Sequence, residues 1–310
     1  MAFDARLIIS LGSPRVVNLS KSQQRFLKAV RDHVTEAGFQ VQPDSATTDD
    51  VEQRLESVRQ CHGVIVLAFS QWNAARIHRK QSKTVVLPSE FNHLGVCMAV
   101  AARRPLLVLR EKVVTERGSL RKGYVRRLID IPNSLDPEWL KSQEFKGTFE
   151  NWKREVNSFR HVFLGYSSQA SDVANTIRVF LAEKVGVTVF DWHDFRPGDT
   201  IWDSIERAES LTNCGIFLFM ADDRLGSGSK QQFAPRDNVV YEAGYFAGAK
   251  GRQRSLIIRE KGAKVPTDLG GILYLELANR GNISEIETKL REKVEQMLDK
   301  RPGTSAQWRR

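Results

Sequence analysis

Residues 215–220 read Gly-Ile-Phe-Leu-Phe-Met, and residues 63–69 read Gly-Val-Ile-Val-Leu-Ala-Phe. Both are short, continuous apolar runs, which are typical of strands buried on both faces of a parallel sheet. Around each run, short apolar segments alternate with amphipathic helical patterns. This alternation predicts parallel strands joined by crossover helices, which is an α/β fold.

The same order of elements occurs twice along the chain. In the first half we expect strands at 7–11, 39–41, 63–69 and 105–109, and helices at 20–37, 49–60 and 89–103. In the second half we expect strands at 161–165, 187–190, 215–220 and 255–258, and helices at 172–184, 200–210 and 238–249. The run at Gly63 matches the run at Gly215 with an offset of 152, and residues 93–95 match residues 242–244 with an offset of 149. The sequence therefore predicts two tandem copies of one α/β unit.

Length and composition fit two globular domains. The chain has 310 residues, of which 41% are hydrophobic and 27% are charged. No apolar run approaches the ~18–20 residues that span a bilayer, and the first residues lack a signal-peptide pattern, so we expect a cytoplasmic protein. The cysteines, Cys61, Cys97 and Cys214, each stand in an apolar stretch and are expected to be packing residues. Motifs for a P-loop, a Rossmann dinucleotide site and a zinc protease are absent, and no metal site is expected.

The net charge of +10 is concentrated in the first half of the chain. Residues 1–150 carry +7 and residues 151–310 carry +3. A basic excess suits an anionic ligand, and it suits a solvated basic surface equally well. Both interpretations stay open. The basic side chains that an anionic signal would meet are Arg76, Arg79, Lys80, Lys83, Arg103, Arg104, Lys122, Arg126 and Arg127.

A connector separates the two copies. Residues 131–137 contain two prolines and break regular structure, and residues 138–156 form a mostly polar helical pattern. Four aromatic residues lie on this segment, and we expect them to dock the two domains: Trp139, Phe145, Phe149 and Trp152.

The second copy contains the residues best suited to chemistry. Gly165-Tyr166-Ser167 ends its first expected strand, at the sheet edge where phosphates and ribose hydroxyls bind in α/β folds. Residues 191–200 form a loop with an arginine, aromatic residues and a Pro-Gly turn, and Thr200 and Asp203 have capping-box spacing for the next helix.

Asn238 and Glu242 are four residues apart and therefore share a helix face. This spacing leaves two interpretations of Glu242 open. It is either a functional carboxylate near the strand ends or a structural carboxylate that caps a loop or pairs with Arg196 or Arg236.

The stretch from His161 to Leu277 resembles TIR domains, and more closely a bacterial TIR-like family of predicted nucleotide-binding proteins that act as anti-phage effectors. The resemblance is carried by residues 162–167 (Val-Phe-Leu-Gly-Tyr-Ser), 196–198 (Arg-Pro-Gly), 220–223 (Met-Ala-Asp-Asp), 236–246 (Arg-Asp-Asn-Val-Val-Tyr-Glu-Ala-Gly-Tyr-Phe) and 265–274 (Val-Pro-Thr-Asp-Leu-Gly-Gly-Ile-Leu-Tyr). It implies an NAD⁺ glycohydrolase that uses Glu242 as its catalytic residue, with NAD⁺ as substrate and no cofactor. Such a reaction passes through an oxocarbenium-like transition state, and because nicotinamide leaves as a neutral molecule, one carboxylate is sufficient.

The other candidate site residues surround Glu242 in this interpretation. Ser167, Arg196 and Asn238 are candidates for ribose, diphosphate and amide contacts. The expected apolar neighbours, which exclude water or stack on a ring, are Phe163, Tyr166, Trp192 and Trp202, and Gly165 belongs to the same strand end.

Residues 61–67 and 88–95 in the first copy resemble nucleoside 2-deoxyribosyltransferase-like and other TIR-like domains. His93 stands there in the place of Glu242, so a glycosidic carboxylate is absent unless Glu90 takes that role. We expect a degenerate copy that binds a nucleotide-like ligand or a protein, or that serves only as a scaffold.

These inferences predict two tandem flavodoxin-like/TIR-like domains. Residues 1–131 form a degenerate regulatory or sensor domain, 132–158 a helical linker, 159–300 a TIR-like NADase domain and 301–310 a loose tail. The predicted function is a regulated NAD⁺ glycohydrolase that yields ADP-ribose or cyclic ADP-ribose and forms a homo-oligomer on activation, with a nucleotide second messenger at the first domain and neither a membrane nor a nucleic-acid partner. The alternatives are a non-enzymatic nucleotide-sensing or TIR–TIR assembly module, or a nucleoside deoxyribosyltransferase or hydrolase.

Overall fold

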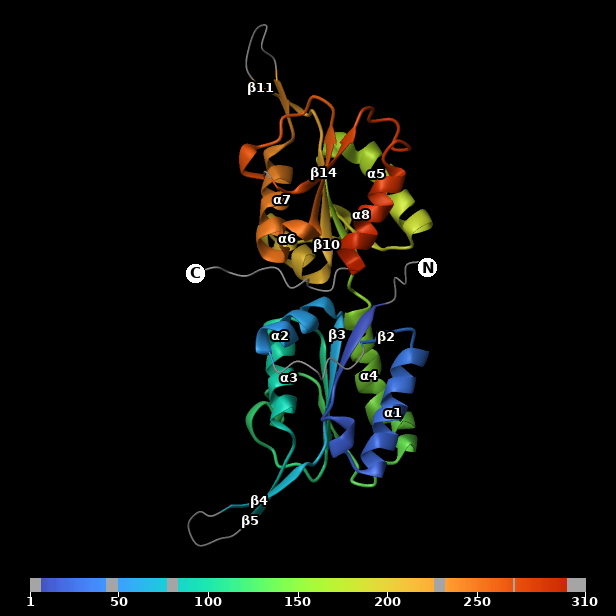
Figure 1. The fold of residues 1–310 in the computed structure, drawn as a ribbon, viewed down its shortest axis with the longest axis vertical. Coiled ribbons are helices and arrows are strands. Elements are labelled where there is room, and N and C mark those ends of the chain that lie inside the picture. The colour runs from blue at the N-terminus through green and yellow to red at the C-terminus, as the bar shows by residue number, and fades with distance from the viewer. Residues whose placement is uncertain (1–6, 43–49, 77–82, 226–231, 270, 300–310) are drawn as a thin grey trace. The chain divides into compact units, whose positions relative to one another are not determined.

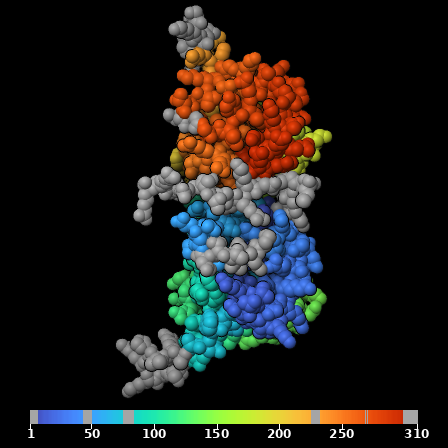
Figure 2. Space-filling view, in the orientation of Figure 1, coloured from blue at the N-terminus to red at the C-terminus, as the bar shows by residue number. Residues whose placement is uncertain are grey.

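The computed structural model describes residues 7–42, 50–76, 83–225, 232–269 and 271–299. The chain divides after Ser158 into two compact units (Figure 1). In the space-filling view, the described residues of the N-terminal unit are coloured blue to green and those of the C-terminal unit mostly yellow to red (Figure 2). The expected tail at 301–310 and the basic residues Arg79 and Lys80 lie outside the described residues.

The N-terminal unit is a parallel five-stranded sheet with the order β2-β1-β3-β6-β7. The strands are β1 (Ile8–Gly12), β2 (Gln40–Val41), β3 (Gly63–Ala68), β6 (Leu106–Glu111) and β7 (Leu128–Ile131). Helices α1 (Lys21–Glu36) and α4 (Gln143–Val156) cover one face, and α2 (Val51–Gln60) and α3 (Glu90–Ala101) cover the other (Figure 1). Strands β4 (Trp72–Arg76) and β5 (Lys83–Leu87) form an antiparallel pair. Short turns of helix are η1 (Val16–Asn18), η2 (Gly118–Leu120) and η3 (Pro137–Lys141).

The C-terminal unit repeats this topology with the sheet order β14-β13-β10-β8-β9, also all parallel. Its strands are β8 (Val162–Gly165), β9 (Val189–Phe190), β10 (Cys214–Phe219), β13 (Ser255–Glu260) and β14 (Leu273–Leu277). Helices α5 (Ser171–Phe180) and α8 (Glu287–Asp299) cover one face, and α6 (Ile201–Leu211) and α7 (Asp237–Lys250) cover the other. Strands β11 (Asp223–Leu225) and β12 (Gln232–Ala234) form an antiparallel pair. Short turns of helix are η4 (Ser168–Ala170), η5 (Leu181–Val185), η6 (Trp192–Asp194), η7 (Arg252–Arg254) and η8 (Thr267–Leu269).

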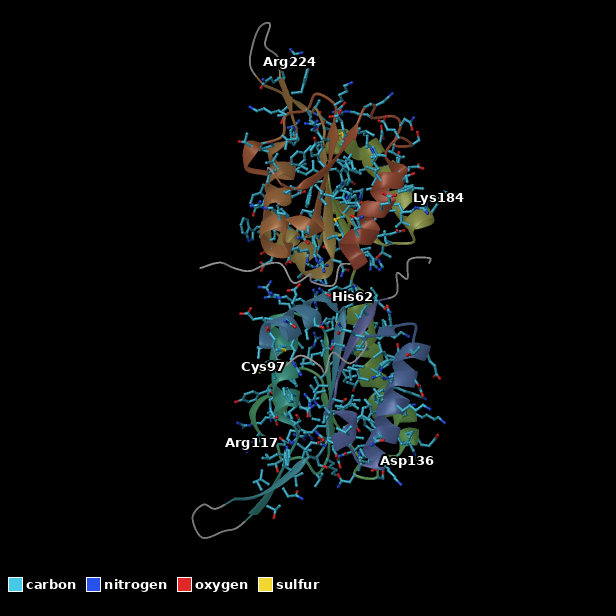
Figure 3. All side chains as sticks on the ribbon, in the orientation of Figure 1. His62, Cys97, Arg117, Asp136, Lys184 and Arg224 are labelled. Atoms are coloured by element: carbon cyan, nitrogen blue, oxygen red, sulfur yellow. The ribbon has the colours of Figure 1, made fainter. Side chains whose placement is uncertain are left out.

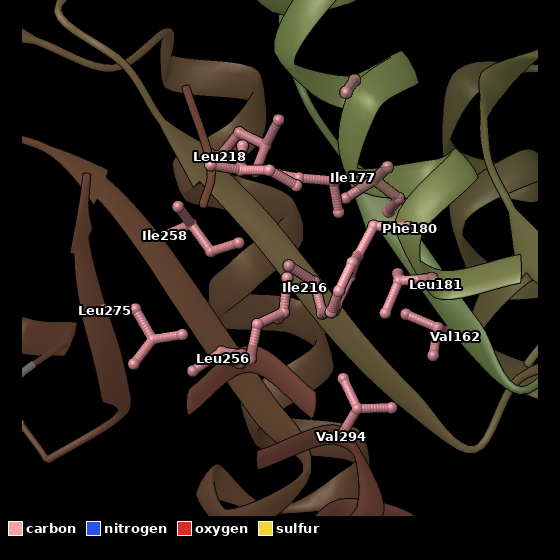
Figure 4. Close-up of a cluster of buried hydrophobic side chains, with 14 of the residues drawn as sticks. Val162, Ile177, Phe180, Leu181, Ile216, Leu218, Leu256, Ile258, Leu275 and Val294 are labelled. Atoms are coloured by element: carbon pink, nitrogen blue, oxygen red, sulfur yellow. The ribbon is translucent and has the colours of Figure 1, made fainter. Parts of the chain in front are cut away.

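The α/β fold with two parallel sheets confirms the predicted fold class. Successive residues of a strand point to opposite faces of its sheet, so each central strand supplies side chains to two cores. In β10, Ile216 and Leu218 pack under α5 and α8 (Figure 4), whereas Phe217 and Phe219 pack under α6 and α7. Thr200 caps α6 in a capping box with Asp203, as its spacing predicts.

The helical connector belongs to the N-terminal unit. Phe145, Phe149 and Trp152 of α4 are buried in the core that α1 and the sheet form, and Trp139 packs against the same cluster. The prediction that these aromatic residues dock the two domains is therefore wrong. Instead, together with α1, they cover one face of the N-terminal sheet.

Two further expectations need correction. The offset of 152 between Gly63 and Gly215 is wrong by one residue, because a Cβ on Gly63 would meet Trp152 of α4, whereas one on Gly215 would meet Phe246 of α7. A shift of one residue turns every side chain of a strand to the opposite face. Cys97, expected to be a packing residue, is exposed on α3 (Figure 3), whereas Cys61 and Cys214 are buried.

Candidate active site

Glu242 lies on the buried face of helix α7. Val239, Ala243 and Phe246 share that face and are fully buried, as their helical spacing predicts. Glu242 is only 8% exposed and is the ionisable member of this buried stripe. The helix therefore holds a carboxyl group against the sheet at a place where its neighbours are apolar.

The end of strand β8 makes room for this carboxyl group. A Cβ on Gly165 would lie 2.5 Å from Glu242 Oε2 and 2.8 Å from Phe217 Cδ1, closer than real side chains approach. Strands β8 and β10 are neighbours, and the helices that follow them, α5 and α7, cover opposite faces. Such a place is the switch point of a parallel sheet. In α/β proteins, ligands bind there, just beyond the carboxyl ends of the strands.

Burial without a hydrogen-bond partner for Oε2 determines the pKa of Glu242. Its Oε2 has no hydrogen-bond partner among the described residues. Desolvation by burial raises the pKa of Glu242 to about 8. Arg236 pairs with Asp223 at 3.2 Å, and Arg196 is exposed on its loop, so the structural alternative of an ion pair to Glu242 finds no support in the described part of the chain.

Phe163 and Tyr166 take opposite sides of the sheet. The Phe163 ring stacks on Phe246, with 4.8 Å between ring centroids, in the core beside Glu242. Tyr166 is buried in the other core, and burial followed by the charge of Asp191 raises its pKa to about 12. The structure therefore places Phe163 beside Glu242 and separates Tyr166 from it, because strand residues alternate between faces.

Ser167 belongs to a buried polar network at the same sheet edge. Its Oγ donates to Asp222 Oδ2 at 2.5 Å, and Arg280 Nη2 donates to Asp222 Oδ1 at 3.0 Å. Arg280 Nε also donates to Glu260 at 2.8 Å, and the Ala221 amide donates to Glu260 at 2.7 Å. Sequence reasoning missed Arg280 and Glu260, since a contact 58 residues away, from Asp222 to Arg280, leaves no local pattern.

The remaining candidates are surface residues. Trp192 stacks on His193 with 3.8 Å between ring centroids, and the ring centroids of Trp202 and Tyr241 lie 5.5 Å apart. Trp192 is 50% exposed and Trp202 is 57% exposed. Arg196 and Asn238 are also exposed. Within the described ranges, no group of three or more His, Cys, Asp or Glu side chains is placed to hold a metal ion, and no helix is long and apolar enough to cross a membrane.

The place of Glu242 in the N-terminal unit also needs correction. Glu242 is the sixth residue of α7, which begins at Asp237, and the sixth residue of α3, which begins at Glu90, is Gly95. Gly95 and not His93 therefore occupies the position equivalent to Glu242. His93 instead contacts Ser119 Oγ at 2.9 Å, and Glu90 is exposed.

The family match that comparison with known proteins finds lies in the C-terminal unit. Residues 161–279 match the family model described as the TIR domain of the CAP12/Pycsar effector protein. CD-NTase-associated protein 12 of Lachnospiraceae bacterium (strain RUG226) is 37% identical over 113 residues, which are 36% of this chain and 35% of that protein. Pycsar effector protein BcPycTIR of Burkholderia cepacia is 30% identical over 179 residues, which are 56% of this chain and 55% of that protein. The chain thus spans about a third to a half of these relatives.

Among solved structures, the TIR domain of the Toll-related receptor TRR-2 from Hydra magnipapillata covers 43% of this chain and 96% of its own, with 17% identity and a TM-score of 0.32. The sequence matches confirm the predicted resemblance. Residues 161–279 are a TIR domain of the CAP12/Pycsar effector kind.

Proposed function

We propose that the C-terminal unit cleaves NAD⁺ between nicotinamide and ribose, and that Glu242 is its catalytic residue. The observation that carries the proposal is a carboxyl group buried at the switch point of the sheet, whose Oε2 has no hydrogen-bond partner among the described residues. A protein gains no stability from such a group, whereas strongly perturbed carboxyl groups are characteristic of functional sites.

The chemistry needs the ionised carboxylate. Glu242 accepts hydrogen bonds from the ribose hydroxyls and stabilises the positive charge that grows on the ribose ring as nicotinamide leaves. The cationic nicotinamide ring favours the ionised form of a nearby carboxyl, so substrate binding lowers the pKa that burial raises. The apolar side chains beside it, Phe163, Phe217 and Phe246, exclude water from this charge.

The other candidates take supporting roles in this proposal. Arg196 binds the diphosphate, Asn238 contacts ribose, and the exposed rings of Trp192 and Trp202 stack on the substrate. Ser167 positions the strand end, because its hydroxyl is committed to Asp222.

We further propose that this activity is that of a regulated effector. The names of the relatives, CD-NTase-associated protein and Pycsar effector, support an anti-phage role that begins with a nucleotide signal. Such an enzyme would act in the cytoplasm and form a homo-oligomer on activation, in which the loop at 191–198 reaches a neighbouring protomer. The N-terminal unit then controls the enzyme.

The substrate class is tested by chromatography of NAD⁺, nucleosides and deoxynucleosides incubated with the full chain, over a range of protein concentrations and with a panel of cyclic nucleotides. Nicotinamide release from NAD⁺ supports the proposal. Cleavage of nucleosides alone would instead make the protein a nucleoside hydrolase or deoxyribosyltransferase. Turnover of neither, under every condition, would favour a non-enzymatic sensing or assembly module.

A further inference from the structure

The N-terminal unit has its own cavity at the equivalent edge of its sheet. The cavity has a volume of about 270 Å³ and lies between residues 10–16, at the carboxyl end of β1, and helices α2 and α3. Strands β1 and β3 are neighbours, and α1 and α3 cover opposite faces, so this is the switch point of the N-terminal sheet.

Asn92 leaves an unsatisfied acceptor at this cavity. Its side chain lines the cavity and is 2% exposed. Asn92 Nδ2 donates to the Leu67 carbonyl at 2.9 Å, which fixes the orientation of the amide because only its nitrogen can donate. Asn92 Oδ1 has no partner within the described residues. An unpaired buried acceptor is destabilising, and an N–H or O–H donor on a ligand would satisfy it.

The charges at the cavity are positive. Arg15 and Arg54 line it, and none of its described lining residues is acidic. The Arg54 guanidinium lies over the Phe91 ring, 4.6 Å from the centroid, and this stacking orients its donors. A guanidinium group held in a fixed orientation can bind two phosphate oxygens at once through two parallel N–H···O hydrogen bonds.

The rest of the lining suits a base. Apolar side chains contribute much of the wall, namely Leu11, Val16, Val58, Leu94 and Met98. The volume of about 270 Å³ lies just below the ~300–1,000 Å³ typical of small-molecule sites, so one mononucleotide fits better than an oligonucleotide. Gly95 also lines the cavity, where the C-terminal unit has Glu242, so none of the described lining residues offers a carboxylate that could break a glycosidic bond.

We propose that this cavity binds a mononucleotide, with its phosphate at Arg15 and Arg54 and a donor of its base at Asn92 Oδ1, and does not cleave it. The described lining residues include none of the basic residues singled out from the sequence. A mononucleotide bound here would be the regulatory signal of the proposed function. Only this regulatory consequence rests on the proposed function, and the binding itself does not.

Calorimetric titration of the full chain tests the proposal. The Glu242→Gln background removes any turnover, so failure of binding and failure of NAD⁺ cleavage are measured separately. The titrants are the 5′-mononucleotides and 3′,5′-cyclic mononucleotides of the four bases, ribose 5-phosphate and inorganic phosphate. We expect at least one mononucleotide to saturate one site per chain, and each substitution of Arg54→Gln and Asn92→Leu to weaken it at least tenfold.

Gly95→Leu is the decisive variant, because a Cβ there has room, 3.6 Å from Val66 Cγ2, and the longer side chain fills the cavity. We expect it to abolish binding. The matched controls are Gly147→Leu, on an exposed helix position of the same unit, and Arg59→Gln, which lies on α2 outside the cavity, and both should bind as the parent does. Absence of saturation by every mononucleotide, unchanged binding in folded Gly95→Leu, or equal affinity for ribose 5-phosphate would overturn the proposal.

Discussion

Glu242 is 8% exposed, and its Oε2 finds no partner in the described part of the chain. Burial of this kind stabilises the protonated form, so the free protein holds a neutral carboxyl group at neutral pH. The proposed reaction requires the ionised form. The pH dependence of catalysis and of stability therefore both report on this one side chain.

The rate of NAD⁺ cleavage should rise with pH. Because kcat/KM reports ionisation of the free enzyme, it should increase about tenfold per pH unit below the pKa of about 8 and level off above it. Initial rates of nicotinamide release between pH 6 and pH 9.5 measure this. A profile that is flat or falls with pH would show that the ionised Glu242 is not required.

Glu242→Gln should stabilise the C-terminal unit at high pH. The folded state keeps a proton that the unfolded chain releases above its ordinary pKa of 4.5, so the stability contributed by Glu242 falls as pH rises from 4.5 to about 8. Glutamine removes this loss, and the variant should gain on the order of a few kcal/mol at pH 8 and little at pH 5. Thermal unfolding at both pH values measures the difference. An equal Tm shift at the two values would contradict the account.

At the scale of elements, the end of β8 and the start of α7 form the site together. Gly165→Ala should displace the Glu242 carboxyl and the Phe217 ring, since the new Cβ would lie 2.5 Å and 2.8 Å from them. We expect at least a tenfold loss of NAD⁺ cleavage with the fold retained. Gly248→Ala is the matched control, because nothing lies within 4 Å of its Cβ. Equal activities of the two variants would mean that β8 does not position Glu242.

The network at the ends of β10 and β13 should hold this edge of the sheet. Arg280→Met leaves the buried Asp222 carboxylate, whose side chain is 1% exposed, with Ser167 alone among its described partners. An unpaired buried charge should cost about 3–5 kcal/mol, reduced here because Arg280 is itself partly exposed. Chemical denaturation measures the loss. A change below 0.5 kcal/mol, the usual range of a surface substitution, would show that the network does not stabilise the edge.

The arrangement of helices and strands also shows which parts of the fold and of the site can be predicted from the sequence. Apolar runs and helical periods located the central strands and the main helices because these signals are local. The place of Glu242 followed from its helix and from the family resemblance. The partners of Asp222, the face of Tyr166 and the role of α4 could not be predicted, because each depends on which distant segments pack together.

At the scale of the whole molecule, two copies of one topology have diverged in chemistry. The C-terminal copy holds a buried carboxyl at its switch point, and the N-terminal copy holds a cavity with Asn92 and two arginines. In the proposed function, one copy reacts and the other senses.

The assignment of α4 to the N-terminal unit is testable on the whole chain. Trp152 is fully buried, and its Nε1 donates to the Pro105 carbonyl at 3.1 Å. Trp152→Ala should destabilise the N-terminal unit by about 3–5 kcal/mol. In differential scanning calorimetry the N-terminal transition should move to lower temperature. Preferential loss of the C-terminal transition would contradict this assignment.

The most direct test of the central claim is the rate of nicotinamide release from NAD⁺ by the full chain, compared between Glu242→Gln and Glu292→Gln. Glu292 is an exposed glutamate on α8, which covers the opposite face of the C-terminal sheet, so Glu292→Gln makes the same replacement of side chain away from the site. The account predicts at least a hundredfold loss in Glu242→Gln and an unchanged rate in Glu292→Gln. A Glu242→Gln variant that releases nicotinamide at the parent rate would contradict the assignment of Glu242 as the catalytic residue.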